Sequence, residues 1–101
     1  LRGANLWRTD LWGANLQEAD LREANLQMAD LRRTDLQKAD LQKADLRKAN
    51  LWRANLRGAN LLLTDLRETD LTHSIGLTQD QIVWAIIDCL TRLPPHLQVF
   101  P

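Results

Sequence analysis

The sequence predicts an all-β solenoid of five-residue repeats, closed at its C-terminal end by an α-helix. Leucine occupies every fifth position from Leu1 to Leu71. From Asn5 to Asp70, the residue before each leucine is Asp or Asn, and the residue before that is Ala or Thr. A short fixed period is the signature of a repeat architecture and outweighs local propensity.

The period excludes a single helix and a single straight strand. Leu, Ala, Arg, Lys and Gln favour helices, but five residues advance a helix by a net angle of about 140°, which scatters the leucines around its surface. An odd period also places successive leucines on opposite faces of an extended strand. The backbone must therefore turn once per repeat.

Within a repeat, the leucine and the Ala or Thr two residues before it share one face of a strand and are expected to point inward. Each buried leucine contributes about 1.5–3 kcal/mol. The Asp or Asn and the two variable residues then face water. We interpret these Asp and Asn residues as structural rather than catalytic, because their short side chains hydrogen-bond nearby backbone groups in turns.

A different pattern begins after Leu71. Thr78 and Gln81 form a predicted capping box. A helical stripe of apolar residues follows, with Ala85 and Cys89 at its margin, and predicts a helix over residues 79–91; the stripe comprises Ile82, Val83, Ile86, Ile87 and Leu90. Pro94 and Pro95 prevent its continuation. The helix is expected to cover the last coil next to Leu62 and Leu63.

The repeated pattern Ala-Asp/Asn-Leu-X-X resembles the pentapeptide-repeat family over about residues 1–75. The resemblance implies a right-handed, four-sided β-helix of nearly four coils, with residues twenty apart stacked in columns. Residues 76–101 then form the helical cap and tail of the same single domain. Small members of this family, many from photosynthetic bacteria, have a similar C-terminal cap that begins with Gly-Leu-Thr and ends with Thr-Arg-Leu-Pro.

Composition restricts the partners and the compartment. The chain has 101 residues, 13 Lys and Arg against 13 Asp and Glu, and one cysteine. Balanced charge gives no large field to attract nucleic acid or anionic membrane. No apolar run is long enough for a membrane span. A lone cysteine removes the usual reason for an oxidising compartment, so we expect a cytoplasmic protein, although the start at Leu1 leaves export of a mature chain open.

No catalytic, cofactor-binding or metal-ligating constellation is present in the sequence. Cys89 is expected to be a small core residue of the cap, and His73 and His96 stand alone as surface residues. The four glycines are isolated and lack the spacing of a phosphate loop. We therefore expect no enzymatic activity, no cofactor and no metal.

Stacking residues twenty apart gives one candidate interaction face. Trp12, Arg32 and Trp52 fall in one column, with Gly13, Arg33 and Arg53 beside it, and Trp7 lies on the preceding face. Cation–π contact is worth about 0.5–1 kcal/mol at exposed sites, so an arginine between two indoles can stiffen the solenoid. The alternative is a binding face for a partner.

The predicted function is a non-enzymatic scaffold that binds a protein partner through a rigid surface. Some relatives in the family act on DNA gyrase through an acidic, DNA-like rod; the balanced charge of residues 1–73 argues against that role here. Weak binding of single-stranded nucleic acid by the Trp/Arg face is a second alternative, which Asp10, Asp30 and Asp70 oppose. The uncovered first coil, at Leu1 and Leu6, predicts weak self-association or a missing N-terminal segment.

Overall fold

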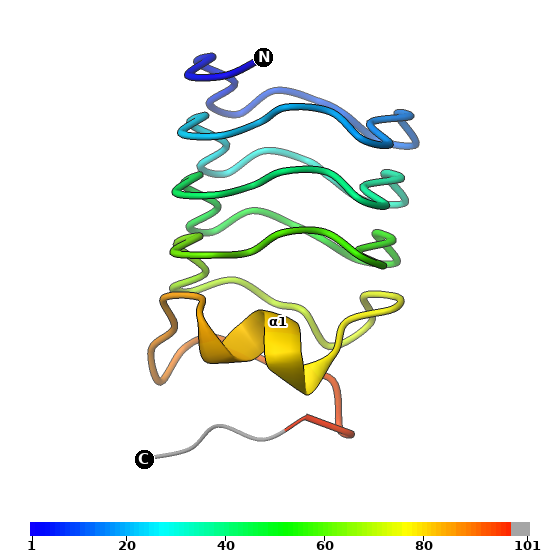
Figure 1. Cartoon of the computed structure of the whole chain (residues 1–101), viewed down its shortest axis with the longest axis vertical. Coiled ribbons are helices and arrows are strands. Elements are labelled where there is room, and N and C mark those ends of the chain that lie inside the picture. Colours follow the sequence, from blue (N-terminus) through cyan, green and yellow to red (C-terminus); the bar gives the residue numbers. More distant parts are fainter. Residues whose placement is uncertain (98–101) are drawn as a thin grey trace.

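The backbone winds into a stack of coils, and four five-residue repeats complete each turn (Figure 1). The structure, a computed structural model, describes residues 1–97. Parallel bridges join residues twenty apart, from Asn5–Asn25 through Asn55–Ile75. The molecule is 33 Å long and 20 Å wide. The prediction of a repeat solenoid is confirmed.

Residues 26–30 show how a five-residue unit can satisfy all of its backbone donors. Three N–H groups donate to a neighbouring coil, one closes the turn, and one donates to the Asp or Asn side chain. For residues 26–30 the acceptors are Asp45 O for Leu26 (2.8 Å), Asn25 Oδ1 for Gln27 (3.1 Å), Arg47 O for Met28 (3.0 Å), Leu26 O for Ala29 (3.1 Å) and Thr9 O for Asp30 (2.9 Å).

From Gly3 to Glu68, the second outward residue of each repeat has a left-handed backbone. Its φ lies between 55° at Leu63 and 61° at Lys48 where the residue is not glycine. Glycine takes this conformation without steric cost and occupies the same position at Gly3, Gly13 and Gly58. The sequence analysis did not anticipate this conformation, because mostly charged residues adopt it here.

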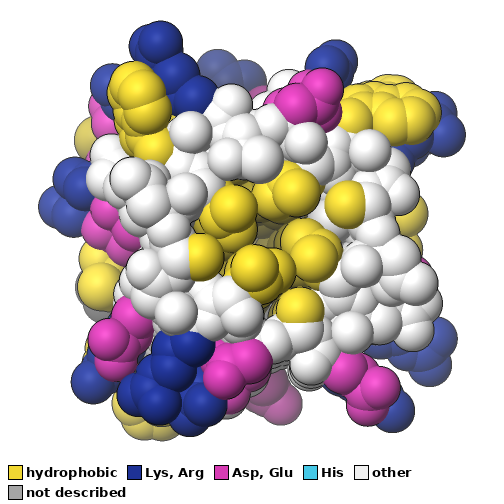
Figure 2. Space-filling model, turned by 90° about the horizontal axis from the view of Figure 1, so that it is seen from above, with side chains coloured by type: hydrophobic (Ala, Val, Ile, Leu, Met, Phe, Trp, Pro, Cys, Tyr) yellow, Lys and Arg dark blue, Asp and Glu magenta, His cyan; other side chains and the backbone are white. Residues whose placement is uncertain are grey.

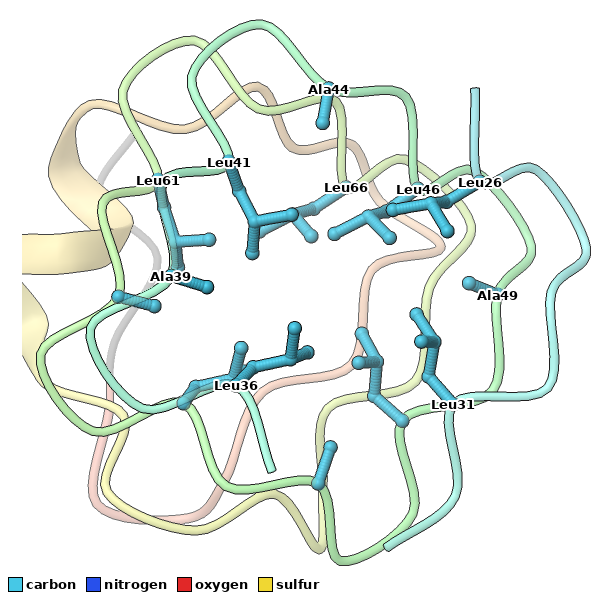
Figure 3. Packing of buried hydrophobic residues seen from close by; sticks show 14 of the residues in the cluster. Leu26, Leu31, Leu36, Ala39, Leu41, Ala44, Leu46, Ala49, Leu61 and Leu66 are labelled. Carbon is cyan, nitrogen blue, oxygen red and sulfur yellow. The ribbon is translucent and has the colours of Figure 1, made fainter. Parts of the chain in front are cut away.

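The core is a column of leucines lined by small residues, as predicted (Figure 3). The repeat leucines from Leu21 to Leu71 are at most 2% exposed. Thr replaces Ala without leaving a buried polar atom unsatisfied, because its hydroxyl donates to a leucine carbonyl one coil away: Thr34 to Leu11 (2.8 Å), Thr64 to Leu41 (2.6 Å) and Thr69 to Leu46 (2.8 Å).

The C-terminal helix is much shorter than predicted. Helix α1 spans Gln79–Val83 and begins with the expected capping box, in which Gln81 Oε1 accepts the Thr78 N–H at 2.7 Å. The chain then returns to the coil, where Ile86 pairs with Asp65 and Arg92 with Asp70. The prediction of a helix over residues 79–91 was wrong, because a longer helix would leave the edge of the last coil unpaired.

This path also changes which apolar residues are buried. Ile82, Leu77 and Leu97 cover the core, whereas Val83 and Trp84 are exposed. Ile86 and Leu90 of the expected stripe are exposed too, as are Leu62 and Leu63. Cys89 is exposed rather than buried in a cap, so its prediction as a core residue was also wrong.

The first coil leaves its interior open at the N-terminal end of the stack. Leu1 is 60% exposed, and Leu6, Leu11 and Leu16 are only partly buried. Figure 2 shows hydrophobic side chains at this end, framed by backbone and charged groups. Self-association through this end stays a prediction.

Candidate interaction face

The structure brings the five predicted residues to one side of the coil stack, here named the tryptophan face: Trp12, Arg32, Arg33, Trp52 and Arg53. Bridges Asp10–Asp30, Asp30–Asn50 and Asn50–Asp70 hold the repeats of this face in register. Trp12, Arg32 and Trp52 occupy the first outward position of their repeats, and Arg33 and Arg53 occupy the second. All five residues are exposed.

Trp52 is the centre of the face. The guanidinium carbon of Arg53 lies 4.7 Å from its ring centroid, and that of Arg33, one coil away, lies 5.2 Å from it. Within residues 1–97, neither arginine forms an ion pair. Trp52 therefore holds two cations whose charge no carboxylate of the described chain neutralises.

The twenty-residue column suggested that Arg32 lies between the indoles of Trp12 and Trp52, but the structure places it elsewhere. Its Nε donates to Asp30 Oδ1 at 2.9 Å and its Nη2 to Asp30 Oδ2 at 2.7 Å. These hydrogen bonds lower the pKa of the Asp30 carboxyl and raise that of the Arg32 guanidinium. A bidentate pair with the Asp of its own repeat is the stronger interaction, so Arg32 is neutralised.

A cleft of about 420 Å³ lies beside Trp52 and is lined by Arg32, Asn50, Trp52, Asp70 and His73. Asp70 accepts the Thr72 N–H at 2.9 Å. Hydrogen bonding to Thr72, followed by the charges of Arg92 and His73, lowers the pKa of the Asp70 carboxyl. The cleft thus combines an indole, an amide, an imidazole and one carboxylate that no arginine of its own repeat pairs.

The sequence analysis missed Asn50 and His73 as members of this cleft. Asp70 entered it only as a charge opposing the arginines. Both missed residues follow from the twenty-residue columns, since position 50 is the corner before Trp52 and position 73 lies one coil beyond Arg53. His73 was predicted to stand alone on the surface, but in the structure it lines this cleft.

Other kinds of site are not found in the described part of the chain. Across residues 1–97, no group of three or more His, Cys, Asp or Glu side chains is arranged to hold a metal ion. The same residues contain no helix with the length and apolar character that crossing a membrane requires.

Comparison with known proteins identifies the repeat. A family model described as pentapeptide repeats matches residues 1–37 and 34–73. The chain is similar to the solved structure of Rfr23, a pentapeptide repeat protein from the cyanobacterium Cyanothece 51142. The identity is 34%, the TM-score is 0.77, and the match covers 89% of this chain and 60% of that one. The chain thus spans less than two thirds of the length of Rfr23.

A second solved structure is alr5209, a pentapeptide repeat protein from Nostoc Pcc 7120. It is 38% identical over 84% of this chain and 77% of its own, with a TM-score of 0.45. No curated protein sequence gives a significant match. The repeat register, the coil stack and the family model agree, and the chain belongs to the pentapeptide-repeat family.

Proposed function

We propose that this pentapeptide-repeat chain is a non-enzymatic scaffold that binds a protein partner through the tryptophan face. One observation carries the proposal: Trp52 lies beside a cleft and holds two arginines that no carboxylate of residues 1–97 neutralises. Trp and Arg dominate the energetics of protein interfaces. A rigid solenoid also presents such side chains without the entropy cost of ordering a loop.

Family membership supports the finer features of the scaffold as well. The proposal includes a right-handed, four-sided β-helix of nearly four coils, with residues 76–97 covering its C-terminal end. This architecture fixes the spacing between coils at about 4.8 Å. Side chains from different coils of the tryptophan face are therefore presented to a partner at a fixed spacing.

Affinity capture from a lysate of the source organism, followed by mass spectrometry, tests the proposal. We expect Trp52→Ala to remove a partner that the parent chain captures. Trp7→Ala is the matched control, because Trp7 is also exposed and also holds a stacked arginine, Arg8, at 4.8 Å from its ring centroid. Capture that is the same for the parent and for Trp52→Ala would rule out this face.

A further inference from the structure

Three tryptophans at the same repeat position differ in the number of arginines stacked on them. Within residues 1–97, Trp12 has no such arginine, Trp7 has Arg8, and Trp52 has both Arg33 and Arg53. Arg8 and Arg53 each stack on the tryptophan directly before them, at 4.8 and 4.7 Å. Trp52 is distinguished by the second arginine, which comes from the neighbouring coil.

Stacking prepares these guanidinium groups for ligand binding. A guanidinium is planar and has five N–H donors around its edge, so contact of its face with an indole leaves the edge donors free. The ring also limits the rotamers of two long side chains, which reduces the entropy that binding must remove. The geometry at Trp52 therefore provides two prearranged forks, each able to bind a carboxylate through two hydrogen bonds.

Arg33 and Arg53 are the two arginines of the face that form no ion pair among residues 1–97. Arg32 is neutralised by Asp30 at 2.7 Å. Asp70 accepts the backbone N–H of Thr72, in its own repeat. Arg33 and Arg53 remain the available cations, next to a cleft of about 420 Å³ that can receive a neighbouring side chain of a ligand.

We infer that Arg33 and Arg53, held by Trp52, bind a pair of carboxylates in an acidic peptide segment of the protein partner. This inference rests on the proposed function of the tryptophan face and names the chemistry of its ligand. Nucleic acid fits less well, because it needs a longer row of cations and free aromatic faces for base stacking. Here Arg33 and Arg53 occupy the indole of Trp52, so it is not free to stack with a base.

Fluorescence anisotropy with a labelled poly-glutamate peptide tests the inference, with poly-glutamine and a labelled single-stranded oligonucleotide as comparison probes. We expect poly-glutamate to bind at low salt. The double variant Arg33→Gln/Arg53→Gln should lower that affinity by at least about tenfold, since each charge-assisted contact is worth about that factor. Circular dichroism of each variant verifies that the coil stack has formed.

Two further variants separate a specific site from general charge attraction. Arg8→Gln removes an arginine stacked on a single tryptophan and should leave the affinity unchanged. Arg33→Lys/Arg53→Lys keeps both charges but loses the planar forks, so its affinity should fall between the parent and the Gln variant. An equal loss in Arg8→Gln and in the Gln double variant would overturn the inference.

The remaining outcomes separate the inference from the proposed function. Absence of poly-glutamate binding, or tighter binding of the oligonucleotide, overturns the acidic-peptide inference. If Trp52→Ala nevertheless removes a captured protein, the scaffold function stands with a different ligand chemistry. If Trp52→Ala also leaves capture unchanged, both the inference and the proposed face fall.

Discussion

The tryptophan face and its neighbour use arginine in opposite ways. The neighbouring face carries an arginine ladder, formed by Asp45, Arg47, Asp65 and Arg67. Arg47 binds Asp45 at 2.7 Å and lies 3.6 Å from Asp65, which binds Arg67 at 2.6 Å. On the tryptophan face, Arg33 and Arg53 stack on Trp52 and pair with no carboxylate of residues 1–97. The arginines of the ladder are neutralised by neighbouring carboxylates, whereas Arg33 and Arg53 are not.

The position of an arginine within the repeat causes this difference. At the first outward position, an arginine that follows Asp by two residues folds back onto it, as at Arg22, Arg32, Arg47 and Arg67. Arg57 follows Asn55 instead and has no ion pair among the described residues.

At the second outward position, where the backbone is left-handed, Arg33 and Arg53 do not pair with the Asp or Asn of their own repeat. In the tripeptide Asp-Leu-Arg, the aspartate thus neutralises the arginine. An arginine one position later in the repeat is left without this partner.

The largest effect should come from making the tryptophan face resemble the ladder. The double substitution Asn50→Asp/Trp52→Arg places an Asp-Leu-Arg tripeptide there and keeps the net charge constant. The new pair should close as Asp45 and Arg47 do, while Arg33 and Arg53 lose their shared ring. Anisotropy should show at least about a tenfold loss of poly-glutamate affinity, with the circular dichroism spectrum unchanged. Retained affinity would mean that Trp52 does not organise the site.

An intermediate effect on stability should distinguish the two arginine positions. Arg53 has φ 56°, so Arg53→Gly removes a left-handed strain of about 1 kcal/mol and should leave stability equal or higher. Arg47→Gly should lower stability, because glycine there costs about 0.5–1 kcal/mol in backbone entropy, and the pair with Asp45 is also lost. Urea unfolding of both variants measures the contrast. If both glycines destabilise equally, position in the repeat is not the cause.

The smallest effect is a pH-dependent one in the ladder. Asp65→Asn keeps the Asx bond to the Arg67 N–H but removes the carboxylate, and should cost about 0.5–1 kcal/mol at neutral pH. Hydrogen bonds from Arg67 lower the pKa of Asp65 in the folded state. Its contribution is therefore present above the unfolded pKa of about 3.9 and is lost as pH falls through the lower folded pKa.

Thermal unfolding across an acid pH series checks this prediction. The Tm difference between the parent and Asp65→Asn should be largest near neutral pH and should shrink below about pH 4. Asn50→Asp is an informative control, because it adds a carboxylate without a matching arginine at position 52. A Tm difference for Asp65→Asn that is independent of pH would show that the carboxylate charge contributes nothing.

The sequence was sufficient for the repeat, because the five-residue period determines which side chains point inward. It correctly assigned the buried leucines and the Asp and Asn turn bonds. The capping box at Thr78 and Gln81 was also local enough to predict. Each of these features depends on residues close in sequence or on one fixed period.

The sequence was insufficient where a residue could form alternative contacts, some within its own repeat and some with another coil. The apolar stripe from Ile82 to Leu90 has a helical period, but Leu66 and Leu71 needed acceptors, and they donate to Ile86 O at 2.8 Å and Arg92 O at 2.7 Å. Arg32 was likewise expected to contact indoles in other coils, although Asp30 in its own repeat offered a stronger partner. The first error arose from helical periodicity and the second from column alignment, and neither argument accounted for a competing hydrogen bond.

The twenty-residue offset between bridged residues has a consequence for insertions and deletions. Removing one five-residue repeat between Arg33 and Trp52 would keep every leucine inside, yet it would rotate all later side chains by a quarter turn and separate Arg33 from Trp52. Removing twenty residues would shorten the rod by one coil and leave the later columns aligned. The core thus tolerates length changes in steps of five, whereas the alignment of side chains in columns between coils is kept only in steps of twenty.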